Sequence, residues 1–126
     1  MNLEEMGRRA KEAARQLNRA GVTEKNKGLE AVAQALIRES DYLLRENETD
    51  MAAGRENGMN QGLLDRLQLT RERIEGMAEG LMQIVALDDP VGEVLSMKKR
   101  PNGLLVGKKR VPLGVVAIIY EARPNV

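Results

Sequence analysis

Residues 113–119 of the chain read LGVVAII, an unbroken apolar run. Such a run is typical of a β-strand that is buried on both faces of a parallel sheet. A parallel neighbour needs a crossover of roughly a dozen residues or more, usually a helix, whereas seven residues follow this run. The strand must therefore pair with another chain or with a later part of a larger α/β protein. We expect the second, because helices, a ribbon and one orphan strand do not close a core.

Helical periodicity fills the chain before residue 91. Apolar residues repeat every three or four positions at about 3–20, 24–40, 41–55, 63–67 and 71–87, which predicts five helices. We expect Asn2, Thr23 and Thr70 to cap three of them through their side-chain oxygens, and Gly21 to end the first. Four methionines at helical spacing are expected in the core rather than on an adaptable binding surface: Met6, Met51, Met77 and Met82.

Residues 92–112 change to an extended pattern. Two stretches rich in Val and Leu flank Pro101-Asn102-Gly103, and Asn-Gly between extended segments is a strong hairpin signal. The sequence predicts an antiparallel ribbon that brings together the basic triplets 98–100 and 108–110. Such a cluster of positive charge would suit nucleic acid. We expect no nucleic-acid partner, because no aromatic residue interleaves the lysines to stack on bases, and charge on a thin ribbon protects its edges from aggregation.

Charge and composition narrow the function further. The net charge is +1, but residues 1–93 carry 13 basic and 18 acidic side chains (−5), and residues 94–126 carry 7 basic and 1 acidic (+6), which indicates two differently built parts. Cysteine and histidine are absent from the 126 residues. The sequence therefore supplies no disulfide, Cys/His metal site, thiolate nucleophile or imidazole base. No metal site is expected. Without a membrane span or a signal peptide, we expect a cytoplasmic location and no membrane partner.

The segment 110–126, RVPLGVVAIIYEARPNV, resembles the first cofactor-domain strand and the following loop of the gamma-glutamyl phosphate reductases. This family, also called glutamate-5-semialdehyde dehydrogenases, sits in the aldehyde dehydrogenase superfamily. The resemblance extends to residues 47–58, 64–67, 89–94 and 100–104, so it covers nearly the whole chain. Lys98 departs from it, at a position where relatives often carry an aromatic residue.

The resemblance implies an incomplete α/β fold. Residues 1–91 would form the N-terminal helical part of the cofactor-binding domain, and residues 92–112 a β-hairpin arm for oligomerisation. Residues 113–126 would form the first parallel strand of a Rossmann-like NADP-binding domain, with its cofactor and substrate loop. The chain is therefore expected to be an N-terminal fragment and to associate as a homo-oligomer through the hairpin.

The reaction that the resemblance implies is the NADPH-dependent reduction of gamma-glutamyl phosphate to glutamate 5-semialdehyde, with release of phosphate, in proline biosynthesis. A cysteine thiolate attacks the acyl phosphate, and hydride from the nicotinamide reduces the resulting thioester. That cysteine is expected beyond Val126. The fragment alone is therefore expected to be inactive.

Site residues are expected where the 113–119 strand ends, because ligands of open α/β sheets bind beyond the carboxyl ends of the strands. The resemblance implies that the cofactor contacts Tyr120, Glu121 and Ala122. At the same strand end, the planar guanidinium of Arg123 suits a phosphate or carboxylate of the substrate. The superfamily resemblance implies that Asn125 donates a hydrogen bond to the oxyanion.

Other roles stay open for the last two residues. Counting without a gap from Gly114 places Arg123, not Asn125, at the position of the superfamily's oxyanion asparagine. Arg123 is also suited to a structural ion pair with Glu121 or another neighbour, and Asn125 to a turn beside Pro124.

A second class of function is compatible with the same residues. The chain would then be a non-enzymatic helical interaction module, which docks onto another chain through its charged hairpin and its orphan strand.

Overall fold

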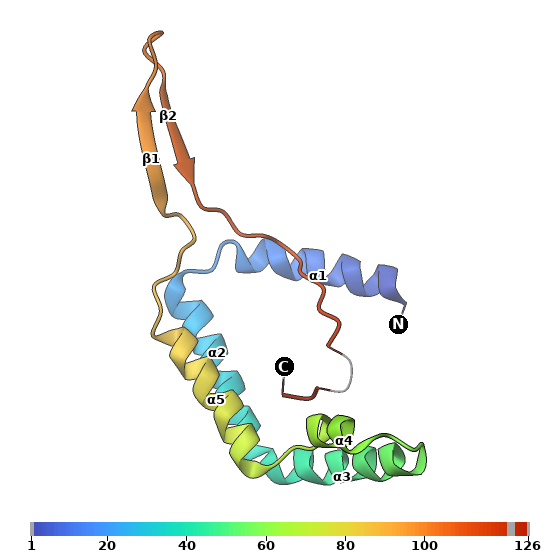
Figure 1. Cartoon of the computed structure of the whole chain (residues 1–126). Coiled ribbons are helices and arrows are strands. Elements are labelled where there is room, and N and C mark those ends of the chain that lie inside the picture. Colours follow the sequence, from blue (N-terminus) through green and yellow to red (C-terminus); the bar gives the residue numbers. More distant parts are fainter. Residues whose placement is uncertain (1, 121–122, 126) are drawn as a thin grey trace. The chain divides into compact units, whose positions relative to one another are not determined.

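The computed structural model describes residues 2–120 and 123–125. Its elements follow the order α1, α2, α3, α4, α5, β1 and β2 along the chain (Figure 1). Contacts between residues group the chain into two units. One consists of Met1–Val22 with Asp88–Ala117, and the other of Thr23–Leu87 with Ile118–Val126. This grouping does not test the three functional segments expected from the sequence, which stay a prediction.

In the first unit, α1 (Leu3–Leu17) begins where the sequence predicted a cap. Oδ1 of Asn2 accepts a hydrogen bond from the backbone N–H of Glu5 at 2.8 Å. This bond satisfies one of the donors that a helix leaves free in its first turn. The Glu5 carboxylate in turn pairs with Arg8 at 2.8 Å on the exposed surface, a contact that adds little stability.

The end of α1 and its apolar stripe differ from expectation. The helix ends at Leu17 and does not reach Gly21, because the following residues bond in tighter turns, such as Ala20 N–H to the Leu17 carbonyl at 3.1 Å. Within the described residues the predicted apolar stripe is not covered: Leu3 is 86% exposed, Met6 is exposed, and α1 has no buried residue. An amphipathic pattern forms the helix but does not by itself supply a partner for it.

The same unit contains the predicted antiparallel hairpin, formed by β1 (Val94–Lys99) and β2 (Leu105–Lys109). Lys99 lies opposite Leu105 in the register. Gly103 in the turn has a φ of +88°, which glycine adopts without steric cost. Every residue of both strands is exposed. The prediction of the ribbon and its Asn-Gly turn is confirmed.

The apolar run 113–119 forms no hydrogen-bonded strand in the described part of the chain, in contrast to the prediction of a strand there. The physical reason is the one that made the strand an orphan in the sequence: a strand exists by pairing, and the described residues offer this run no parallel neighbour. Its side chains are correspondingly exposed, with Leu113 and Ile119 both at 94%.

The second unit contains the four remaining helices: α2 (Val22–Arg38), α3 (Ser40–Glu56), α4 (Gln61–Leu67) and α5 (Arg71–Val85). Their positions confirm the predicted helices to within a few residues. The predicted cap of α2 was wrong, since the helix begins at Val22 and Thr23 already lies in its first turn. Gly21 therefore stands at the cap position, which glycine tolerates.

The core of this unit is small and built from aliphatic residues. Ile74 on α5 is fully buried, and the other buried apolar residues are Ala33, Met51, Leu64 and Ala78. Met51 therefore confirms the expected core role. That role was wrong for Met6 and Met82, which are exposed, because Met6 lies on the uncovered side of α1 and Met82 lines an open groove.

A buried amide ties α3 to the connection between α4 and α5. The Asn47 side chain donates from Nδ2 to the Leu67 carbonyl at 2.8 Å and accepts at Oδ1 from the Leu69 N–H at 2.7 Å. Asn47 is buried. The Leu67 carbonyl lies at the end of α4 and the Leu69 N–H lies just after it, so neither has a partner within the helix, and Asn47 supplies both missing bonds.

We predict that Asn47→Ala lowers the free energy of unfolding by about 1–3 kcal/mol, because it leaves the Leu67 carbonyl and the Leu69 N–H without their partner. Urea denaturation followed by circular dichroism measures this change. The matched control is Thr49→Ala on the same helix, whose exposed side chain makes only a 3.5 Å contact to the Arg45 carbonyl. Equal losses in the two variants would contradict the role assigned to Asn47.

Candidate functional site

A polar pocket of about 330 Å³ lies where the described C-terminal residues meet α4 and α5 in the second unit. Five residues line it: Asp65, Arg66, Arg73, Arg123 and Asn125. We call this site the polar pocket. It combines the two described residues for which the sequence predicted substrate chemistry, Arg123 and Asn125, with three residues for which it predicted none.

Two features of α4 position Asp65 and Arg66. Asn60 caps the helix, since its Oδ1 accepts from the Leu63 N–H at 3.0 Å. Gly54 on α3 allows α4 to approach closely, because a Cβ built there would lie 3.2 Å from Leu64 Cδ2. A larger residue at Gly54 would push α4 away and displace the pocket wall with it.

Arg73 is held in place from α5. Thr70 caps this helix as predicted, with its Oγ1 accepting from the Arg73 N–H at 3.2 Å. The Arg73 guanidinium then reaches back to α4, donating from Nη1 to the carbonyls of Asp65 and Gln68, the latter at 2.6 Å, and from Nη2 to Asp65 Oδ1 at 3.1 Å. Arg73 therefore acts as a brace across the α4–α5 connection.

Beside this brace, the first turn of α5 carries Glu72. A hydrogen bond from its own backbone N–H and one from the Thr70 side chain lower the pKa of Glu72. The carboxylate therefore complements the free N–H groups at the start of the helix.

The polar pocket is electropositive. Its three guanidinium groups face one carboxylate, which leaves a formal charge of +2. Asp65 is paired with Arg73, whereas neither Arg66 nor Arg123 has a hydrogen-bonded or ion-paired partner within residues 2–120 and 123–125. Two guanidinium groups are thus available to a ligand, and their planar donor pattern matches a phosphate or a carboxylate.

Two of the predicted site residues lie in the polar pocket and the others do not or are not described. Arg123 and Asn125 both line the polar pocket. Tyr120 does not line it and is half exposed, while the predicted cofactor residues Glu121 and Ala122 lie outside the described residues.

Asp65, Arg66 and Arg73 were not predicted as site residues. The sequence does contain a signal, because residues 64–67 belong to the family resemblance and Thr70 is a helix cap. Nothing in helical periodicity, however, distinguishes a ligand-facing arginine from a solvated one.

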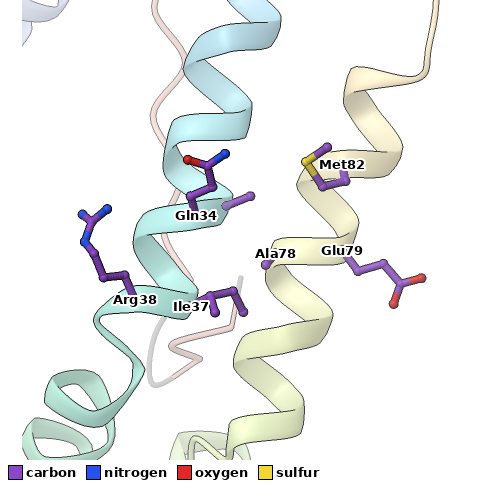
Figure 2. A pocket seen from close by; sticks show the side chains of 7 residues that line it. Gln34, Ile37, Arg38, Ala78, Glu79 and Met82 are labelled. Atoms are coloured by element: carbon purple, nitrogen blue, oxygen red, sulfur yellow. The ribbon is translucent and has the colours of Figure 1, made fainter.

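A second hollow, which we call the apolar groove, lies between α2 and α5 and has a volume of about 420 Å³. Figure 2 shows the side chains of Gln34, Ile37 and Arg38 on α2, and of Ala78, Glu79 and Met82 on α5. Ala33 completes its lining. The groove has an apolar floor and no convergent polar groups, so it offers no acid–base or anion chemistry.

Other kinds of site are absent from the described ranges. Within residues 2–120 and 123–125 no group of three or more acidic residues is placed to hold a metal ion. In the same ranges, no helix has the length and apolar character needed to cross a membrane.

Among known proteins, no family model matches the chain. Gamma-glutamyl phosphate reductase of Lachnospira eligens is 55% identical over 125 residues, which cover 99% of this chain and 30% of that protein. The protein of the same name from Halothermothrix orenii is 56% identical over 119 residues, which cover 94% of this chain and 28% of that protein.

A solved structure gives the same result. The crystal structure of gamma-glutamyl phosphate reductase from Thermotoga maritima superposes with a TM-score of 0.93 at 38% identity, over 99% of this chain and 30% of that one. The chain is homologous to the N-terminal part of gamma-glutamyl phosphate reductases. It spans about 30% of the length of the reductases that it matches. The expected α/β class, with N-terminal helices followed by a hairpin, is confirmed by this match.

Proposed function

We propose that the chain supplies the substrate-binding N-terminal part of an NADPH-dependent reductase, which converts gamma-glutamyl phosphate to glutamate 5-semialdehyde and phosphate in proline biosynthesis in the cytoplasm. The polar pocket is the observation that carries this proposal, because it gathers Arg66, Arg73, Arg123 and Asn125 in a chain homologous to reductases named for that phosphorylated substrate. An acyl phosphate is an anion, and an electropositive pocket with two available guanidinium groups suits it.

Arg123 and Asn125 bind different groups at the reacting end of the substrate. The Arg123 guanidinium binds phosphate oxygens and stabilises the charge that the leaving phosphate gathers. The Asn125 amide donates to the acyl oxygen, whose negative charge grows as a nucleophile adds to the carbon. Both residues belong to one short segment next to Pro124, so their spacing is restrained by the ring of that proline.

The nucleophile must come from elsewhere in the enzyme. The 126 residues contain no cysteine, and a thiolate is the group that this proposal requires for the acyl transfer. The proposal therefore assigns substrate recognition and oxyanion stabilisation to this chain and the covalent step to a further part of the protein.

The described residues do not by themselves fit a dinucleotide. A nicotinamide cofactor normally places its pyrophosphate on the helix that follows the first strand, and no helix follows residue 113 within residues 113–120 and 123–125. Tyr120 is the one described member of the predicted cofactor set, and it is half exposed. The names of the similar reductases agree with a hydride donor such as a nicotinamide cofactor, and the choice of NADPH comes from the family resemblance of the sequence.

The non-enzymatic alternative has support of its own in the uncovered stripe of α1 and in the exposed hairpin. Its sequence-based form, a helical module that docks onto another chain, predicts binding without catalysis. A test of catalysis therefore separates the two functions.

We predict that a chimera, in which this chain replaces the matching segment of the Lachnospira eligens reductase, catalyses the reverse reaction of glutamate 5-semialdehyde, phosphate and NADP+, measured by the formation of NADPH. Arg123→Gln should lower kcat/KM by about 10- to 100-fold, as expected when a charged hydrogen bond is lost. Asn125→Ala should lower kcat by about 100-fold or more.

The matched control for Arg123→Gln is Arg8→Gln on α1, which removes the same charge from an exposed ion pair. We expect this variant to keep full activity. An inactive chimera that is folded would overturn the reductase function and favour the interaction module. Full activity in both Arg123→Gln and Asn125→Ala would overturn the roles given to the two residues.

We also propose that the hairpin 92–112 joins subunits into a homo-oligomer. A two-stranded ribbon is marginally stable alone, and its outer edges offer unpaired backbone groups to another strand. Leu105 and Val106 are exposed on β2, which leaves apolar surface at the position where a second subunit would pack.

We predict that Leu105→Ser combined with Val106→Ser dissociates the oligomer of the chimera, as measured by sedimentation velocity, because apolar contact area is lost. The control is Lys99→Ser combined with Lys98→Ser, the residues that lie opposite these two in the register. We expect the control to keep the oligomer. Dissociation in neither variant, or a monomer before any substitution, would contradict this role of the hairpin.

A further inference from the structure

The polar pocket contains a carboxylate that a simple anion site would avoid. Asp65 lines the pocket together with three arginines, and its side chain is 66% exposed. Within the described residues Arg73 pairs with Oδ1, and no hydrogen bond is made to Oδ2. A carboxylate with a free oxygen repels a phosphate, so its presence indicates a ligand that carries a positive group as well.

Holding Arg73 accounts for only one oxygen of the Asp65 carboxylate, because Arg73 pairs with Oδ1. The Arg73 guanidinium already donates from Nη1 to two backbone carbonyls, those of Asp65 and Gln68. These bonds need the backbone of residue 65 and not its carboxylate. The Asp65 side chain is therefore available for a second purpose, while Arg73 stays in place as the brace.

Asp65 and Arg66 are neighbours on α4 and face the same pocket with opposite charges. This arrangement is complementary to an α-amino acid, in which an ammonium and a carboxylate leave the same carbon. The ammonium pairs with Asp65 and the carboxylate with Arg66, whose planar donors suit it. α4 is short, but the Asn60 cap and the close contact at Gly54 fix it, so that both charges are presented from a rigid wall.

We propose that Asp65 and Arg66 recognise the amino-acid end of the substrate, its α-ammonium and α-carboxylate, while Arg123 and Asn125 serve the acyl phosphate end. This assignment rests on the proposed function and deepens it by naming the residues that select an α-amino acid over a plain acid. The charges agree, because a ligand with one phosphate, one carboxylate and one ammonium carries about two net negative charges and the pocket carries +2.

The test compares aldehyde substrates that lack one group at a time in the chimera that contains the full chain. Glutamate 5-semialdehyde carries both groups, 5-oxopentanoate lacks the ammonium, and 4-aminobutanal lacks the carboxylate. We expect Asp65→Asn to raise the KM for glutamate 5-semialdehyde about 10-fold, with little change in kcat, and to leave the KM for 5-oxopentanoate unchanged. Arg66→Gln should raise the KM for glutamate 5-semialdehyde and for 5-oxopentanoate, which both carry the carboxylate, about 10-fold. It should leave the KM for 4-aminobutanal unchanged.

Matched controls are Asp50→Asn and Arg45→Gln, which remove the same charges from exposed positions on α3 and should leave every KM unchanged. Asp65→Glu and Arg66→Lys keep the charges and should restore part of the discrimination. If Asp65→Asn raises the KM for 5-oxopentanoate as much as for glutamate 5-semialdehyde, or raises neither, the assignment of the ammonium is overturned. An unmodified chimera without activity would instead overturn the reductase function itself.

Discussion

The side chain of Asn47 makes two hydrogen bonds, to the Leu67 carbonyl and from the Leu69 N–H, on which the geometry of the polar pocket depends. These bonds fix the chain where α4 ends, between the helix that carries Arg66 and the helix that carries Arg73. The amide is buried, so water cannot replace it at low cost. A buried polar side chain thus stabilises the connection that forms the pocket wall.

The pocket contains one arginine that holds α4 and α5 together and two arginines that are available to a ligand. Arg73 donates hydrogen bonds to two carbonyls and a carboxylate. Its role is to hold the end of α4 against the start of α5. Arg66 and Arg123 have no partner among the described residues, so their donors remain for a ligand. Asp65 takes part in both roles, since one of its oxygens supports the brace and the other is free.

Much of the fold follows from the sequence because its local signals agree with one another. Caps at Asn2 and Thr70 mark helix starts that the structure contains, and the Asn-Gly turn forms the hairpin. The failures involve partners that a local pattern does not specify. Among residues 2–120 and 123–125, the apolar run 113–119 has strand composition but no strand beside it, and the amphipathic helix α1 has no buried residue.

The candidate site shows the same limit. Arg123 and Asn125 were predicted because they follow a run whose end is a usual ligand position. Asp65, Arg66 and Arg73 were not, because charged residues on helices are mostly solvated. Their distinction lies in a spatial contact between α4, α5 and a segment about fifty residues later, which no periodicity encodes.

The central claim is that Arg66 on α4 and Arg123 near the C-terminus, about fifty residues apart, line one anion site that Arg73 braces. Titration of the chain with inorganic phosphate, followed by the Nε–Hε NMR signals of its arginines, tests this claim most directly. The account predicts that Arg123, which serves the phosphate end, shifts most, that Arg66 and Arg73 in the same pocket shift less but with the same midpoint, and that Arg8 on α1 does not move. Separate curves for Arg66 and Arg123, or shifts no larger than that of Arg8, would contradict it.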